Sequence, residues 1–275
     1  MKVMMPLLAL MLMSATISVK AEVVTDNGGS SYRKLPAGEF QSILKYEDSL
    51  SGVQKVPAFE LMQTPVTNAQ YLRFVQARPQ WQRGKVPSVF AEAQTYLSQW
   101  QSATSLGPKI LPTQPVTQVS WFAAQAYCEA QSARLPTWNE WEYAAAADST
   151  QADARQDPAW QEQILAWYAK PSNTPLDPVG TRPPNFYGVQ DLHGLVWEWT
   201  LDYAAMLVSA DNREQQEPDK LKFCGASALS VEDKENYAVM MRVAMLSALE
   251  AVNATSNLGF RCARDLKTST FSEPL

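Results

Sequence analysis

The sequence predicts an α+β fold with few helices, short strands and much irregular backbone. Three helix starts occur in the first half of the chain, each opened by a hydroxyl side chain of the kind that caps helices, at Thr67, Ser120 and Thr137. Five of the prolines in the second half lie between residues 171 and 184, and turns and short strands should dominate this half: Pro171, Pro175, Pro178, Pro183 and Pro184. The chain contains neither an internal repeat nor a low-complexity tract.

The first elements are expected to be short strands followed by a helix. Residues 32–40 contain the turn Pro36-Ala37-Gly38 leading into a strand, and residues 56–61 read as a second strand. Thr67 and Gln70 then form a capping box, in which each side chain satisfies a backbone N–H of the other. The helix that follows should bury a stripe at the spacing i, i+3, i+4, made of Tyr71, Phe74 and Val75.

Two further helices are expected after a long connection, residues 77–114. Ser120 caps the first of them, whose buried face should hold Trp121, Ala124, Tyr127 and Cys128. Thr137 and Glu140 form a second capping box, and the helix that follows should bury Trp138, Trp141 and Ala145. Residues 149–163 are polar and are expected to be a surface insertion.

The N-terminus has the pattern of a secretory signal peptide. Lys2 supplies a positive charge, residues 3–17 form an apolar run, and a cleavage site ends at Ala21. The run is short for a membrane span, and an uncleaved anchor is the alternative. We therefore expect a signal peptide at 1–21, a flexible leader at 22–31, one domain at 32–268, a C-terminal tail at 269–275, and a periplasmic or secreted protein.

Composition restricts the class of partner. The 275 residues include 23 basic and 28 acidic side chains, a net charge of −5 without a basic stripe, which argues against nucleic-acid binding. No second apolar run approaches a membrane span. In an exported chain, the three cysteines can form a disulfide.

Residues 188–200 are expected to organise the fold. They contain two tryptophans, two carboxylates, two glycines and the only histidine of the chain. A buried indole needs a partner for its N–H, and a buried carboxylate needs a donor or a metal ion. The stretch is therefore either a structural keystone, which the sequence favours, or the wall of a site.

Six sequence blocks, in order and at compatible spacing, identify a family resemblance. They lie at 65–71 (PVTNAQY), 115–121 (PVTQVSW), 134–144 (RLPTWNEWEYA), 185–194 (NFYGVQDLHG), 196–199 (VWEW) and 257–261 (NLGFR). Together they resemble the formylglycine-generating enzyme (sulfatase-modifying factor) family over about residues 32–265. The resemblance implies a single C-type-lectin-like α+β domain.

The resemblance implies several chemistries. The best-known members of the family oxidise a cysteine of a sulfatase to formylglycine with O₂ and a copper(I) ion held by two cysteines. Relatives include sulfoxide synthases of the ergothioneine pathway and a periplasmic protein of pyoverdine maturation. Whether this chain is an enzyme is therefore left open, because function depends on the site rather than on the fold.

The copper site of the family is not expected here. Its two cysteines fall on Asp233 and Ala238, and a soft copper(I) ion needs thiolate or thioether ligands. Nearby methionines would make a different and weaker site, and core filling is their favoured role: Met240, Met241 and Met245. A role for copper or iron stays open.

By the same resemblance, Cys128 and Cys262 match positions that form a disulfide, with two unpaired thiols as the alternative. Four residues are candidates for the catalytic groove: Trp197, Cys224, Ser227 and Arg242. A lone cysteine is more often an apolar filler, which is the alternative for Cys224.

One calcium site of the family can be carried over. Asp191 and Glu198 match its carboxylates, and Gly194 and Val196 match positions that bind through backbone carbonyls. The alternative is that Asp191 caps a turn and Glu198 bonds an arginine or backbone. His193 is expected to be a hydrogen-bonded structural residue rather than a metal ligand.

Two functions follow. The first is an oxidoreductase-type maturation factor that acts on an exported protein, peptide or peptide-derived metabolite. The second is a non-catalytic binding or assembly protein that uses the same groove on an exported partner enzyme.

Overall fold

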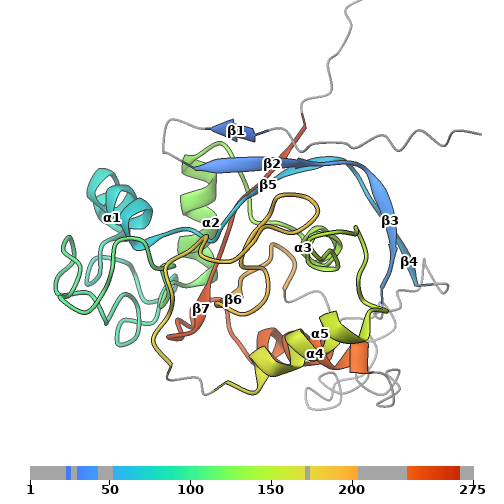
Figure 1. Cartoon of the computed structure of the whole chain (residues 1–275). Helices are drawn as coiled ribbons and strands as arrows, with labels where there is room; N and C mark the ends of the chain where they lie inside the picture. Colours follow the sequence, from blue (N-terminus) through green and yellow to red (C-terminus); the bar gives the residue numbers. More distant parts are fainter. Residues whose placement is uncertain (1–22, 26–29, 43–51, 171–173, 204–233, 267–275) are drawn as a thin grey trace, which may run out of the picture.

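A four-stranded antiparallel sheet contains both the first and the last strand that the structure describes (Figure 1). The structure is a computed structural model that describes residues 23–25, 30–42, 52–170, 174–203 and 234–266. The sheet has the order β1-β2-β5-β8, from β1 (Val23–Thr25), β2 (Ser31–Leu35), β5 (Phe59–Met62) and β8 (Ala263–Asp265). In its register, Tyr32 pairs with Met62 and Leu61 with Ala263. The last family-like motif is therefore fixed beside the first strands.

A separate hairpin continues from this sheet. It consists of β3 (Gly38–Gln41) and β4 (Val53–Val56), which are antiparallel and bury Phe40 and Val56. The single strand predicted at 56–61 is wrong in detail, because Pro57 and Ala58 end β4 before β5 begins. A proline removes a ladder donor, which explains the break.

The three predicted helices are present, with their caps. They are α1 (Asn68–Ala77), α2 (Trp121–Ala130) and α3 (Trp138–Ala145), and a short 3₁₀ turn, η1 (Pro79–Trp81), follows α1. Both predicted capping boxes form, at Thr67 and at Thr137. The hydroxyl of Ser120 accepts from the Ala123 N–H at 3.2 Å. Local capping chemistry therefore places these helices correctly.

Two helices of the second half were not predicted. They are α4 (Pro158–Tyr168) and α5 (Lys234–Ser247), which lie side by side on the side of the molecule away from the sheet (Figure 1). Residues 158–163, at the end of the expected surface insertion 149–163, are exposed or half-buried as expected, but they form the first part of a helix. Asp157 caps α4 by accepting from the Ala159 N–H at 2.8 Å, and Pro158 occupies the first turn.

The central stretch lies in the core beside the last motif. A short parallel pair forms between β6 (Trp197–Glu198) and β7 (Leu258–Gly259). A Cβ on Gly259 would lie 2.7 Å from the carbonyl oxygen of Val116, so only glycine allows this approach. Trp199 is fully buried, and its indole N–H donates to the Val119 carbonyl at 2.9 Å. The stretch is thus a structural keystone, as the sequence favours, and four of its residues also line a cavity, which was the alternative.

The predicted α+β class is confirmed, with short strands and few helices in the described residues. Of the leader expected at 22–31, residues 23–25 form β1 and pair with β2. The signal peptide at 1–21 lies outside the described residues, and the domain boundaries stay predictions. No helix in the described part of the chain is long and apolar enough to cross a membrane.

Candidate functional site

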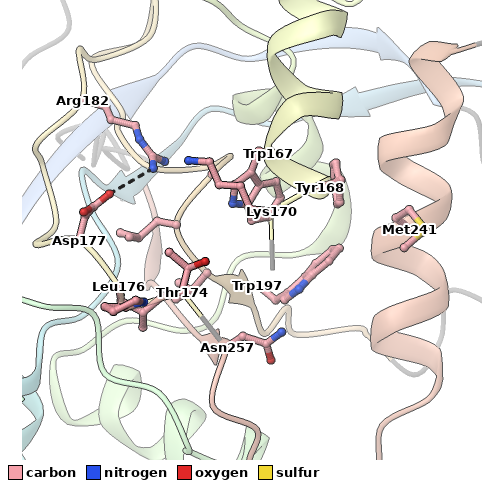
Figure 2. Close-up of a pocket in the computed structure, with 14 residues that line it drawn as sticks. Trp167, Tyr168, Lys170, Thr174, Leu176, Asp177, Arg182, Trp197, Met241 and Asn257 are labelled. Carbon is pink, nitrogen blue, oxygen red and sulfur yellow. Dashed lines mark ion pairs between the residues drawn. The ribbon is translucent and has the colours of Figure 1, made fainter. Parts of the chain in front are cut away.

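A pocket of about 230 Å³ lies where the C-terminal end of α4, the middle of α5 and the central stretch meet (Figure 2). We call it the Trp197 pocket. It is lined by Trp167, Tyr168, Lys170, Thr174, Pro175, Leu176, Asp177, Arg182, Gly194, Leu195, Val196, Trp197, Met241 and Asn257. Its volume matches one group of amino-acid size rather than a drug-sized ligand. Of the four candidate groove residues, Trp197 therefore lines a cavity.

One wall of the pocket is aromatic. The rings of Trp167 and Trp197 have centroids 5.5 Å apart, and those of Tyr168 and Trp197 lie 5.3 Å apart. These are tilted contacts of the kind that aromatic side chains prefer. The wall joins the C-terminal turn of α4 to β6, and it offers apolar surface to a ligand.

Arg242 lies behind this wall and does not line the pocket. Its guanidinium donates to both carboxylate oxygens of Glu142 at 2.7 and 2.8 Å and to the hydroxyl of Tyr168 at 2.9 Å. It also stacks 4.7 Å above the Trp141 ring and is 6 % exposed. Burial acts to lower the pKa of Arg242, but the Glu142 carboxylate offsets this and the pKa is raised. Arg242 therefore stays charged, and its hydrogen bond to the Tyr168 hydroxyl orients a ring that lines the pocket.

The other end of the pocket is polar. Lys170, Asp177 and Arg182 gather there, and Figure 2 shows the Lys170 and Arg182 side chains extending over the same end. Asn257, in the last family-like motif, also lines the pocket, and its carbonyl accepts from the Trp197 N–H at 2.8 Å. The pocket thus combines an apolar wall with charged groups.

Glu198 forms a fully buried ion pair with Arg261. The guanidinium contacts the two carboxylate oxygens at 2.7 and 2.8 Å, and the Trp141 indole N–H donates to the same carboxylate at 3.0 Å. Both charged side chains are completely buried. Glu198 therefore bonds an arginine, which was the alternative to a calcium ion. The ion pair connects the central stretch to the motif at 257–261.

The calcium ligand set does not assemble in this arrangement. Glu198 is committed to Arg261, and the Asp191 carboxylate accepts from the Gly180 N–H at 2.6 Å. Among the residues that the structure describes, no three His, Cys, Asp or Glu side chains gather in a way that could hold a metal ion. The predicted ligand set contains two carboxylates and two backbone carbonyls, so calcium at Asp191, Gly194, Val196 and Glu198 stays a prediction from the resemblance, and in this structure both carboxylates bond protein groups instead.

A copper site of two thiolates does not fit either. Ala238 is buried on α5 with its carbonyl accepting from the Tyr168 hydroxyl at 3.1 Å, while Asp233 lies outside the described residues. Cys224 and Ser227 also lie outside them. Met241 lines the Trp197 pocket, so it is not only core filler. No step can be derived through copper from these positions.

His193 is held as a neutral structural residue. Its Nε2 lies 2.9 Å from the Ala145 carbonyl oxygen, and the rings of Trp141 and Trp160 meet the imidazole nearly edge-on. Nδ1 is buried, and none of the described residues bonds it. Burial, with a smaller effect of the Arg242 charge, lowers the pKa of His193 to about 3. The sequence-based expectation for this residue agrees with the contacts.

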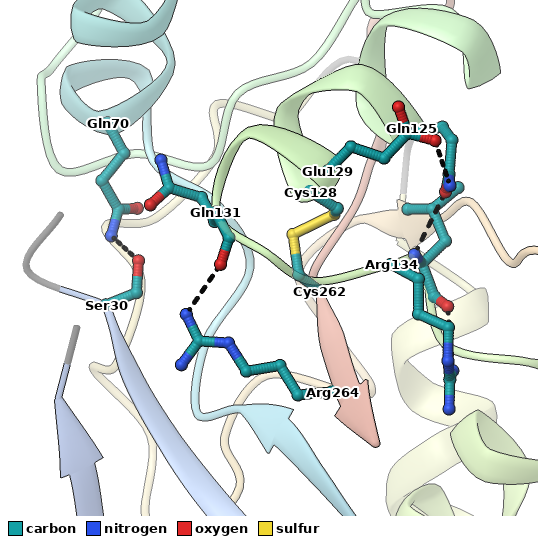
Figure 3. The surroundings of a disulfide bond; sticks show 10 residues. Ser30, Gln70, Gln125, Cys128, Glu129, Gln131, Arg134, Cys262 and Arg264 are labelled. Atoms are coloured by element: carbon teal, nitrogen blue, oxygen red, sulfur yellow. Dashed lines mark hydrogen bonds between the residues drawn. A yellow bond between two sulfur atoms is a disulfide. The ribbon is translucent and has the colours of Figure 1, made fainter. Parts of the chain in front are cut away.

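The disulfide between Cys128 and Cys262 is present in the structure (Figure 3). It connects α2 to the residue that precedes β8, across a sequence separation of 134 residues. The Arg264 guanidinium donates to the Gln131 carbonyl at 3.1 Å beside it. The two contacts fasten the end of α2 to the edge of the sheet.

Several lining residues were missed by sequence reasoning. Trp167 and Tyr168 belong to the unpredicted end of α4, and Lys170 follows it, although the Asp157-Pro158 start of that helix is readable in the sequence. Arg182 lies in a proline-rich connection with no distinguishing pattern. Asn257 is the first residue of the motif at 257–261, but that motif does not indicate that its side chain lines a pocket.

Comparison with known proteins places this geometry in context. Residues 13–266 match the Sulfatase-modifying factor enzyme 1-like domain. The formylglycine-generating enzyme of Mus musculus is 34% identical over 168 residues, covering 55% of this chain and 44% of that protein. The inactive C-alpha-formylglycine-generating enzyme 2 of Bos taurus is 34% identical over 160 residues, covering 54% and 50%. Hercynine oxygenase of Mycobacterium tuberculosis is 34% identical over 163 residues, covering 54% and 38%. The chain spans about half the length, or less, of these relatives.

Proposed function

Because this chain belongs to the sulfatase-modifying factor enzyme family, we propose that it is an exported maturation factor of the oxidoreductase type. Its substrate is a segment of an exported protein, a peptide or a peptide-derived metabolite that binds in the Trp197 pocket. The observation that carries the proposal is the pocket itself, which lies against α5 and the family-like motifs at 196–199 and 257–261.

The described residues supply binding and orientation. Trp167 and Trp197 offer apolar surface, while Asn257 and the charged end offer polar contacts. The oxidant of the proposed class is O₂, and the substrate is the electron donor. The chemical step itself would depend on groups beyond the described residues, with Cys224 as the sulfur candidate.

Oxygen consumption tests the proposal. The mature chain is mixed with a cysteine-containing peptide and either copper or iron, and O₂ uptake is followed with an electrode. We expect uptake above that of a Cys224→Ala variant, and a lower rate for Trp197→Ala, because the pocket loses its wall. Uptake no faster than that of the Cys224→Ala control would refute the oxidoreductase function.

A second function, non-catalytic binding of an exported partner enzyme, is favoured by one observation. The positions of the two copper-binding cysteines hold Asp233 and Ala238, so the binding surface lacks the usual redox ligands. A photo-crosslinker at position 197 would test it in the exported fraction of the native cell. A specific adduct without oxygen uptake supports this function, and uptake without an adduct supports the first.

Export is part of both functions. N-terminal sequencing of the protein from the exported fraction should begin at Glu22. A chain that starts at Met1 in that fraction would instead support an uncleaved anchor.

A further inference from the structure

The charged end of the Trp197 pocket contains an arginine whose charge is weakly neutralised. Among the described residues, the carboxylate oxygen nearest to Arg182 is on Asp177, and it lies 3.7 Å from Nη2, which is outside hydrogen-bond distance. Asp177 is also 64% exposed, so its attraction is screened by solvent. By contrast, the buried guanidinium groups of Arg242 and Arg261 each contact both oxygens of a carboxylate at 2.7 and 2.8 Å.

Arg182 is nevertheless held in place. Its Nη1 donates to the His193 carbonyl at 3.0 Å. The guanidinium lies over Gly194, where a Cβ would come within 2.3 Å of Nη1 and 3.0 Å of Cζ. Gly194 also has φ +91°, a left-handed conformation that disfavours other residues. These contacts fix the Arg182 guanidinium at the pocket and leave its other N–H groups free to donate to a ligand.

Lys170 adds a second cation at the same end. It lines the pocket two residues after Tyr168, and within the described residues no acid lies at ion-pair distance from its ammonium group. With Asp177 as the only acid among the lining residues, the lining charge is Lys170 and Arg182 against one carboxylate, a net +1. One bound carboxylate would neutralise it.

We propose that the Trp197 pocket binds a carboxylate between Lys170 and Arg182, with an aromatic or flat apolar group of the same ligand against Trp167 and Trp197. Arginine binds carboxylates through two parallel N–H groups, and such charge-assisted hydrogen bonds are the stronger class. The proposal rests on the proposed function, because it names the chemistry of the group that enters the same pocket. The carboxylate belongs either to a chain terminus or to an acidic side chain, which have the same chemistry.

Matched probes test this with the mature chain. Calorimetry compares N-acetyl-phenylalanine, which carries a terminal carboxylate, with N-acetyl-phenylalaninamide, which is neutral and otherwise almost identical. We expect the acid to bind about 10-fold more tightly or better, a preference that salt reduces. A third probe, acetyl-Phe-Glu-amide, carries its carboxylate on a side chain. Tighter binding of it than of the terminal acid assigns the site to an internal acidic residue, and the reverse order assigns it to a chain end.

Variants locate the effect. Arg182→Gln should reduce binding of the acid to that of the amide, and Lys170→Gln should reduce it in part. Gly194→Ala should also weaken the acid, because the added Cβ displaces the guanidinium without removing its charge. The matched control is Lys55→Gln, which removes a lysine that is 85% exposed on β4, and it should change nothing.

Equal binding of acid and amide, or an acid preference that survives Arg182→Gln, would overturn the carboxylate site while leaving the pocket as a binding site. Failure of both probes to bind at millimolar concentration would overturn it as well. The proposed function fails separately, through absent oxygen uptake, so the two failures are distinguishable.

Discussion

Acidification should destabilise this protein through its single histidine. The unfolded imidazole takes up a proton near pH 6.5, whereas in the folded chain burial lowers the pKa of His193 to about 3. Between these values the unfolded state binds more protons than the folded state, so stability falls as pH falls from about 6.5 toward 3. The physical reason is that protonated Nδ1 would be a donor without an acceptor among the described residues.

The magnitude follows from the linkage relation. At pH 5 the folded imidazole is neutral and the unfolded one is charged, so the loss is on the order of 2 kcal/mol relative to pH 7. For a domain of this size, that loss lowers the melting temperature by roughly 4–8 °C. The window between pH 7 and 5 is selective, because the chain contains 1 histidine and its ordinary carboxylates titrate below it.

The assay compares thermal unfolding of the native chain and His193→Gln at pH 7 and pH 5. Glutamine retains an N–H that can reach the Ala145 carbonyl but does not titrate. We expect the variant to show little of the pH-dependent loss, whatever its stability at pH 7. A nitrogen NMR titration of the one histidine in the folded protein provides the direct check.

Two results would refute the reasoning. An imidazole that titrates near pH 6.5 in the folded protein would show that the site is hydrated. A native chain and a variant with the same fall in melting temperature between pH 7 and pH 5 would assign the effect to other groups.

Three further predictions concern the scaffold. Reduction of Cys128–Cys262 should lower stability by about 4–5 kcal/mol, from the entropy of a loop of this length, and thiol counting of the unfolded, unreduced chain should find one free thiol rather than three. Glu198→Gln should lower the free energy of unfolding by about 3–5 kcal/mol in denaturant, because Arg261 is left buried without its carboxylate. A chelator should leave the melting temperature of the native chain unchanged. A drop in melting temperature with chelator that Glu198→Gln abolishes would instead establish the calcium loop. Tyr168→Phe should weaken N-acetyl-phenylalanine binding several-fold without unfolding the chain, since the ring stays but loses the bond to its hydroxyl that orients it; unchanged affinity would contradict that role.

Sequence reasoning located the elements that local chemistry determines. The helices after Thr67, Ser120 and Thr137 follow from side chains that bond the first backbone N–H groups of each helix, a contact that needs no tertiary information. The disulfide was implied by the family resemblance, which itself depends on motifs such as the one at 257–261. These features are encoded within a few residues or within a recognisable motif.

The charged end of the pocket could not be found in the same way. Lys170 and Arg182 lie on either side of a proline-rich connection, and they face one cavity only because α4 packs beside β6 and Gly194 leaves room for a guanidinium. The choice of Arg261 as the partner of Glu198 also depends on the β6–β7 pairing. The sequence left both a calcium ion and an arginine open as the partner of Glu198, because the packing that brings Arg261 to this carboxylate is tertiary.

The contacts behind the aromatic wall of the pocket do not involve the side chain at position 238, where the family resemblance places a copper-binding cysteine. The Tyr168 hydroxyl donates to the Ala238 carbonyl at 3.1 Å and accepts from Arg242, one turn further along α5, at 2.9 Å. Neither contact uses the side chain at position 238, so the packing of α4 on α5 and the aromatic wall do not depend on a thiol there. A residue other than cysteine at position 238 therefore leaves the aromatic wall intact. We accordingly expect a ligand to bind in the Trp197 pocket whether or not the chain consumes oxygen.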